Sequence, residues 1–271
     1  MKRKIKWKNV FLCLFILICF IVFIFSLMKI IHWKMDSNKA KEEISDIENT
    51  TEVTEIKDNK KTEIIEQEDI DEDNPYWDYI KMNLISVDFK KLKEKNKDTI
   101  GFIKVNGTNI NYPIVQTKDN DYYLTHSFDK TYNEAGWVFL DYRNSLSDRN
   151  MIIYAHGRLD NIMFGTLKNV LTSGWLKNTD NYVIKLSTEK ENTLWQVFSV
   201  YRIPTTSDYL QINFNDNKEF KNFAEMLKNR SDYNFNTNIN ENDRIITLST
   251  CFNKTDKLVM HAKLIKREVR S

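Results

Sequence analysis

One cysteine in the C-terminal part of the chain has the surroundings of a nucleophile. Cys13 and Cys19 lie inside a long apolar run, so Cys251 has no disulfide partner in the rest of the sequence. An unpaired thiol is either a buried, inert side chain or a reactive group. Cys251 ends the strand-like run RIITLST and precedes the polar segment FNKTDK. Because side chains become accessible where a strand meets a loop, this position favours the nucleophile over the buried alternative.

A thiol nucleophile needs an imidazole or similar group to exchange its proton, and a donor that stabilises the developing oxyanion. His156 ends the run MIIYAH and precedes a glycine, a strand-end position typical of catalytic side chains. The other histidines have simpler interpretations: His32 borders the apolar run, His126 lies in the turn-like THSFD, and His261 lies inside LVMHAKLI as a core or sheet-face residue. His156 is therefore the predicted partner of Cys251.

A metal enzyme is not expected. Outside the apolar run only Cys251 supplies sulfur, and no group of His, Asp and Glu has the spacing of a ligand set. The sequence therefore predicts neither a metal site nor a cofactor.

Short strands must position these residues. Eight runs are rich in β-branched and aromatic side chains and are separated by Asn, Asp, Gly and Lys: 100–105, 111–116, 136–141, 150–156, 181–186, 194–203, 244–250 and 258–265. Their number and spacing predict a mainly β fold with peripheral helices, a closed barrel or sandwich rather than a βαβ arrangement.

Three segments have helical spacing. Residues 162–170 and 217–230 are expected to be helical, the second with Phe220, Phe223 and Leu227 on one face. The segment that begins at Trp77 also has helical spacing, with Ser86 or Asp88 as the cap of a second short helix.

The 271 residues carry 40 Lys and Arg against 38 Asp and Glu, so no overall basic excess points to nucleic acid. The charge is distributed unevenly. Residues 1–35 hold seven basic residues and no acid, residues 36–75 hold fifteen acids and five Lys, and residues 76–271 hold 28 basic and 23 acidic residues. These three regions indicate three environments.

The nineteen residues from Val10 to Met28 have Ser26 as their only polar member and are long enough to span a bilayer. Five basic residues precede them, which predicts a cytoplasmic N-terminus and an extracytoplasmic remainder. A cleaved signal peptide is the alternative, but the apolar run is long for one and no small-x-small site follows it. We therefore expect a basic cytoplasmic tail at 1–9 and a transmembrane anchor at 10–31.

Residues 32–75 are expected to form an acidic extracytoplasmic stalk. Their segment 36–75 has no aromatic residue and is highly charged, a composition that buries too little surface to offset chain entropy. Partial helix, suggested by the spacing of Ile44, Ile47 and Val53, is the less favoured alternative. The folded domain is expected at 76–271.

The combination of TLSTC (247–251) with LVMHAKLI resembles the catalytic signature of sortases, the cysteine transpeptidases of Gram-positive surfaces. Four further segments, in the same order, are similar to class B sortases: YPIVQTKDNDYYLTHSF, GWVFLDYRNS, IIYAHGRLDNIMFGTLKNV and the helical stretch ending LKNRSDYNF. The resemblance covers roughly residues 75–268.

The resemblance implies an eight-stranded sortase barrel with N-terminal helices and a class B helix inserted between the sixth and seventh strands. It implies that Cys251 attacks a C-terminal sorting signal of the Asn-Pro-X-Thr type, that His156 protonates the leaving amine, and that a peptidoglycan amine resolves the thioacyl-enzyme. Thr250, Ser249 and Tyr209 are the expected substrate-binding residues. The implied partners are surface proteins and a cell-wall amine at the cell membrane.

One departure concerns the residue just before the last strand. The family has an arginine where this chain has Lys257, and lysine is a point charge on a flexible stem rather than a rigid fork of donors. Lys257 can still supply a charge-assisted hydrogen bond, and we expect it to take the arginine's role. Arg244 and Arg267 fit that role less well by their offsets.

Three functions remain open at this point. The first is a membrane-anchored transpeptidase, the second is a thiol protease that hydrolyses its acyl-enzyme, and the third is a degenerate sortase-fold module that binds sorting signals with little turnover.

Overall fold

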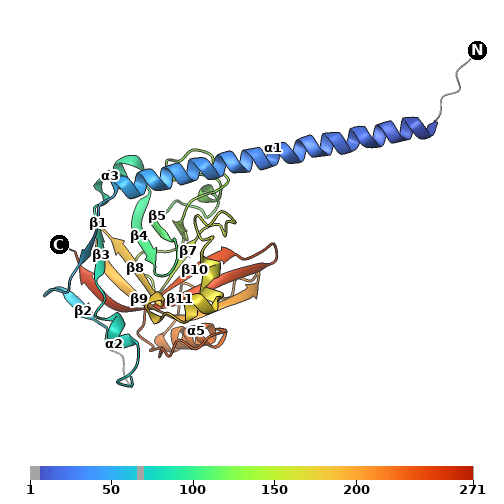
Figure 1. Cartoon of the computed structure of the whole chain (residues 1–271). Coiled ribbons are helices and arrows are strands. Elements are labelled where there is room, and N and C mark those ends of the chain that lie inside the picture. The colour runs from blue at the N-terminus through green and yellow to red at the C-terminus, as the bar shows by residue number, and fades with distance from the viewer. Residues whose placement is uncertain (1–6, 66–69, 271) are drawn as a thin grey trace, which may run out of the picture.

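The computed structural model describes residues 7–65 and 70–270, and a β-barrel forms its centre (Figure 1). The barrel strands are β4 (Thr99–Val105), β5 (Asn111–Val115), β6 (Phe139–Leu140), β7 (Asn150–Tyr154), β8 (Val183–Thr188), β9 (Glu191–Pro204), β10 (Ile245–Cys251) and β11 (Asp256–Val269). Each of the eight predicted strand runs forms one of them.

Hydrogen bonding closes these strands into a barrel. Within the described residues they follow one another in the order β10, β7, β6, β5, β4, β8, β9, β11, and β11 pairs back with β10. Most neighbours are antiparallel, whereas β7 and β10 run parallel. The predicted eight-stranded, mainly β fold is confirmed. Because two parallel strands end at the same edge of a sheet, the residues that follow β7 and β10 are brought together.

The helices lie outside the barrel wall. They are α2 (Tyr76–Tyr79), η1 (Tyr122–Leu124), η2 (Leu167–Leu171), α4 (Ser173–Leu176), η3 (Thr179–Asn181), α3 (Phe89–Lys95) and α5 (Asn217–Asn229). The predicted helix α5 is inserted between the sixth and seventh barrel strands and buries Phe220, Phe223 and Leu227 as expected. Those side chains form a second core cluster with residues of β9 and β11, such as Tyr201 and Val259.

The stretch that begins at Trp77 is less helical than its spacing predicts. Only Tyr76–Tyr79 form a helix there, and Leu84–Val87 form strand β3. The second short helix, α3, is capped by Asp88, whose carboxylate accepts a 2.9 Å hydrogen bond from the Lys90 amide. The predicted segment 162–170 is helical only from Leu167, as the 3-10 turn η2.

The segment expected to be a stalk is ordered instead. Helix α1 runs without interruption from Trp7 to Thr50, and its second half packs on the domain, burying Asp36, Ser37, Ala40 and Ile47 (Figure 1). Two strands then follow. β1 (Val53–Ile56) pairs with β3, and β2 (Thr62–Ile64) pairs with β11 beside the closed barrel.

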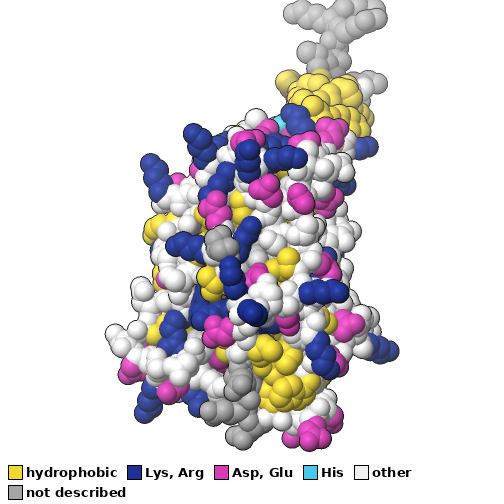
Figure 2. Space-filling model, turned by 90° about the vertical axis from the view of Figure 1, so that its left-hand side faces the viewer, with side chains coloured by type: hydrophobic (Ala, Val, Ile, Leu, Met, Phe, Trp, Pro, Cys, Tyr) yellow, Lys and Arg dark blue, Asp and Glu magenta, His cyan; other side chains and the backbone are white. Residues whose placement is uncertain are grey.

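Ion pairs explain why a highly charged segment docks. Within the described residues, four of its carboxylates pair with cations of the domain: Asp46–Lys95, Glu55–Lys185, Asp58–Lys266 and Glu63–Arg267. Lys266 is fully buried, so Asp58 supplies a charge that the barrel surface itself lacks. Figure 2 shows the end of the molecule opposite the protruding helix, where acidic and basic side chains are interspersed instead of separated by sign.

The first half of α1 projects beyond the domain, and its apolar side chains are exposed. By length and composition this part is able to cross a membrane. Residues 1–6 of the expected basic tail lie outside the described residues.

Candidate active site

The parallel pair β7–β10 brings Cys251 and His156 to one edge of the barrel. The ladder ends at Ser249 opposite Tyr154, and the cysteine and histidine each lie two residues further along their chains. Gly157 is required at this edge, because a Cβ atom placed there would lie 2.2 Å from the carbonyl oxygen of Cys251. A side chain at 157 would therefore push the two strand ends apart.

Cys251 is an exposed, free thiol. The antiparallel register of β10 and β11 places Lys257 directly opposite it, and the Lys257 Nζ donates a 3.1 Å hydrogen bond to the Cys251 Sγ. An ammonium group at this distance stabilises the thiolate, which is the reactive form of cysteine. Sequence reasoning placed Lys257 near the substrate oxygens, and the structure also places it against the nucleophile itself.

His156 is half-buried, and a backbone group fixes its ring. Its Nε2 lies 2.8 Å from the carbonyl oxygen of Leu124. Because a carbonyl only accepts hydrogen bonds, Nε2 carries the proton, and Nδ1 is the nitrogen that can take up or release one.

A pocket of about 680 Å³ opens beside these residues. All six residues expected at the site line it: Cys251, His156, Lys257, Thr250, Ser249 and Tyr209. Its walls are largely apolar, with Leu124, Phe139, Tyr154, Ala155 and Leu210 among the lining residues. A pocket of this size and character suits an extended peptide with small or apolar side chains.

The three expected substrate-binding residues have defined hydrogen bonds. Thr250 Oγ1 donates to the Ala155 carbonyl at 2.7 Å, which ties β10 to the end of β7. The hydroxyls of Tyr209 and Ser249 lie 2.9 Å apart. Burial raises the pKa of the Tyr209 phenol, so Tyr209 remains a neutral donor in the pocket wall.

Helix α5 supports the loop that carries Tyr209. Arg230, just after the helix, forms an ion pair with Asp208, and its second guanidinium nitrogen donates a 3.1 Å hydrogen bond to the same carboxylate. The inserted helix therefore fixes one wall of the pocket.

The other candidates from the sequence lie elsewhere. His261 is fully buried, with its two ring nitrogens 2.9 Å from Thr247 Oγ1 and from the Tyr201 hydroxyl, so its expected core position is confirmed. Arg244 pairs with Glu191, and Arg267 pairs with the β2 segment. Neither arginine lines the pocket beside Cys251.

Sequence reasoning did not identify Leu124 or Tyr154. Tyr154 lies two residues before His156, so strand alternation alone would have placed both on one face. Leu124 acts through its backbone carbonyl and leaves no signal in its side chain.

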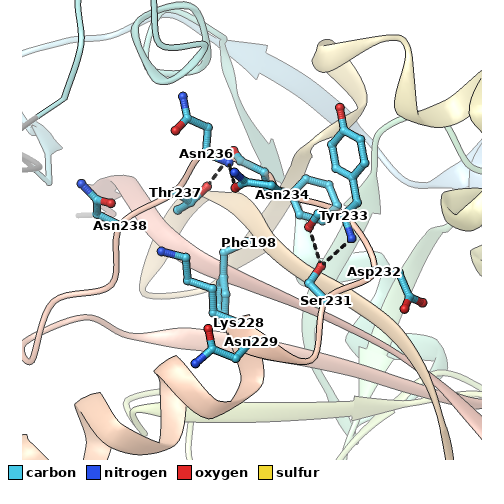
Figure 3. A pocket seen from close by; sticks show the side chains of 11 residues that line it. Phe198, Lys228, Asn229, Ser231, Asp232, Tyr233, Asn234, Asn236, Thr237 and Asn238 are labelled. Atoms are coloured by element: carbon cyan, nitrogen blue, oxygen red, sulfur yellow. Dashed lines mark hydrogen bonds between the residues drawn. The ribbon is translucent and has the colours of Figure 1, made fainter.

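A second pocket, of about 430 Å³, lies beyond the end of α5 and beside Phe198 (Figure 3). Its polar groups bond mainly within their own loop: Ser231 Oγ donates to the Tyr233 carbonyl at 2.7 Å, and the Asn236 amide donates to Asn234 Oδ1 at 2.9 Å. The nucleophile is not among its lining residues. The pocket beside Cys251 is therefore the candidate active site.

Comparisons with known proteins agree with this assignment. Residues 103–265 match the family model described as the sortase domain. Sortase B of Staphylococcus aureus is 35% identical over 184 residues, which cover 66% of this chain and 75% of that protein. Sortase B from B. anthracis superposes with a TM-score of 0.67 at 31% identity, covering 86% of this chain and 99% of that chain. The S. aureus sortase B–substrate complex gives a TM-score of 0.61 at 34% identity, covering 66% and 84%.

Proposed function

Because this chain belongs to the class B sortases, and is therefore a cysteine transpeptidase of the sortase type, we propose that it cleaves a C-terminal sorting signal of the Asn-Pro-X-Thr type and transfers the cleaved surface protein to a cell-wall amine. One observation carries this proposal. The Cys251 Sγ lies 3.1 Å from the Lys257 Nζ at the edge of an apolar pocket that His156 also lines.

In the first step, the Cys251 thiolate attacks the carbonyl carbon that follows the Thr side chain of the signal. The new C–S bond gives a tetrahedral intermediate whose oxyanion needs a donor, and Lys257 is the cationic donor beside the sulfur. The C–N bond then breaks, and His156 gives its proton to the departing amine. The products are a thioester on Cys251 and the released C-terminal peptide.

In the second step, an acceptor amine attacks the thioester. His156, now neutral, accepts the proton of that amine, and the C–S bond breaks to restore the thiolate. The net reaction exchanges one amide bond for another. One sortase B is known as a complex with its substrate and another as a complex with triglycine, which supports a peptide donor and a glycine-type acceptor here.

We also propose that residues 10–31 of α1 anchor the enzyme in the cell membrane, with the N-terminus in the cytoplasm and the barrel outside. The apolar length and exposure of this part of α1 support a single membrane span. The basic residues before it support the orientation.

The test is turnover of a fluorogenic Asn-Pro-X-Thr peptide panel by the full chain in detergent, with and without an added amine. The parent is expected to form an amine-linked product, and Cys251→Ala and His156→Ala are expected to remove turnover. Lys257→Ala is expected to lower kcat by roughly 10²–10³, as for loss of one oxyanion donor, whereas Lys257→Arg retains activity.

Other outcomes would overturn the proposal. Hydrolysis that ignores the amine would indicate a thiol protease. A parent without turnover that gains it in Lys257→Arg would indicate a degenerate module. Turnover retained in Cys251→Ala would exclude the nucleophile.

A further inference from the structure

Helix α1 covers a buried ion pair in the loop that carries His156. This loop, residues 155–165, follows β7. Arg158 donates hydrogen bonds of 2.7–3.2 Å to both carboxylate oxygens of Asp160, and the two side chains are only 6% and 5% exposed. From α1, Ser37 Oγ donates a 2.6 Å hydrogen bond to Asp160 Oδ2, and the Trp33 ring lies 5.4 Å from the Arg158 guanidinium. The helix thus completes the polar contacts of a charge pair that cannot easily rearrange.

The same part of α1 holds a second loop, residues 121–137. The buried Asn133 donates a 3.0 Å hydrogen bond from Nδ2 to the Asp36 carbonyl, and the Glu134 amide donates to Asp36 Oδ2 at 3.2 Å. Further along the helix, Glu43 accepts a 2.6 Å hydrogen bond from the Asp129 amide.

Both loops touch the imidazole. The 121–137 loop supplies the Leu124 carbonyl that holds Nε2, and a Cβ atom on its Gly136 would lie 3.0 Å from His156 Cδ2. The 155–165 loop folds back on the histidine, since the amides of Arg158 and Phe164 donate to the His156 carbonyl at 3.1 and 3.0 Å. The ring is therefore placed by two loops that meet at one turn of α1.

We propose that residues 33–37 of α1 are a positioning element for His156, so that the anchor helix is part of the active-site scaffold as well as a tether. The inference rests on the proposed catalytic role of His156. Asp36 and Ser37 are its positioning residues: the first joins one loop to the helix, and the second joins the other.

This arrangement separates turnover from peptide binding. The opposite wall of the pocket, which includes Tyr209 and Ser249, has no contact with this turn of α1 among the hydrogen bonds of the described residues. Loosening the two loops is therefore expected to misplace the imidazole and lower kcat while KM changes little. Misplacement of a catalytic group by about 1 Å can cost roughly 10²-fold in rate.

The experiment uses the full chain in lipid nanodiscs and the fluorogenic sorting peptide. Ser37→Ala removes the donor to Asp160, and Ser37→Thr keeps a hydroxyl. Ser45→Ala is the matched control, because Ser45 is an exposed serine of the same helix outside both loops. Ile47→Ala is the control for lost stability, because Ile47 is buried further along α1. The measurements are kcat, KM, the melting temperature and the pH profile of Cys251 alkylation by iodoacetamide.

The expected result is a fall in kcat of about 10- to 100-fold in Ser37→Ala, with KM within about twofold, a changed alkylation profile and recovery in Ser37→Thr. Equal kcat in Ser37→Ala and Ser45→Ala would overturn the proposal, as would an equal loss in Ile47→Ala at matched melting temperature. If His156→Ala keeps full turnover, the catalytic role of His156 fails first, which separates that failure from failure of the positioning role.

Discussion

At the scale of single residues, the lysine beside the nucleophile and the buried histidine show how the same strands serve catalysis and stability. Lys257 and His261 both belong to β11. Lys257 is at its open end and points to Cys251, whereas His261 is fully buried, and its ring stacks 5.8 Å from the Phe198 ring. Position along one strand therefore decides whether a titratable side chain reacts or packs.

His261 makes the fold sensitive to acid. Burial first, and the charge of Arg230 second, lower the pKa of His261 from 6.5 to about 3. The unfolded chain binds a proton below pH 6.5 that the folded chain refuses, so stability falls by about 1.4 kcal/mol per pH unit as pH drops from 6.5 toward 3. Urea unfolding at pH 7 and pH 4.5 is expected to show a loss of roughly 2–3 kcal/mol that is smaller in His261→Gln. An identical loss in both proteins would exclude His261 as the source.

At the scale of elements, β10 and β11 position the nucleophile and α5 shapes the cleft. The hairpin register pairs Cys251 with Lys257, and the parallel ladder sets the end of β7 beside the end of β10. The loop with Tyr209 has no ladder of its own and depends on Arg230 and Asp208 for its place.

Loss of the Arg230–Asp208 pair is therefore expected to weaken peptide binding more than chemistry. Arg230→Ala should raise KM by up to about fivefold with kcat nearly unchanged, since a partly exposed ion pair contributes about 0.2–1 kcal/mol. A double-mutant cycle with Asp208→Ala isolates the pair from other contacts of Arg230. Additive effects on KM would show that the pair does not hold the loop.

The sequence predicted the barrel well because each strand is a self-contained run of β-branched and aromatic residues. It also predicted Cys251, His156 and Lys257 from their places at strand ends. The docking of residues 36–65 was not predicted, because the partners that bury this acidic segment, such as Lys185 and Lys266, lie more than a hundred residues away. The helical spacing of Ala40, Ile44 and Ile47 was the local signal for it.

At the scale of the whole molecule, the catalytic edge lies close to the proposed membrane. The apolar run ends at Met28, and the first buried residue of α1 is Asp36, about 12 Å further along a continuous helix. The ends of β9 and β10 extend on the side toward which the exposed half of α1 projects (Figure 1). A barrel held this way, instead of on a long flexible stalk, would present its pocket to substrates at the bilayer surface.

The distance between barrel and bilayer is testable by lengthening α1. Eighteen helical residues inserted after Met28 add five whole turns, which raise the barrel by about 27 Å and keep its rotation. Transfer from a donor peptide held in the same vesicle by a lipid tail is expected to fall roughly tenfold, because its effective concentration at the pocket drops. Transfer from a soluble peptide should stay unchanged, and the same eighteen residues added at the N-terminus are the control. Equal rates with the tethered donor before and after insertion would mean that height above the membrane does not matter. An equal loss with both donors would instead show that the insertion disturbs the docking of α1 on the two histidine loops.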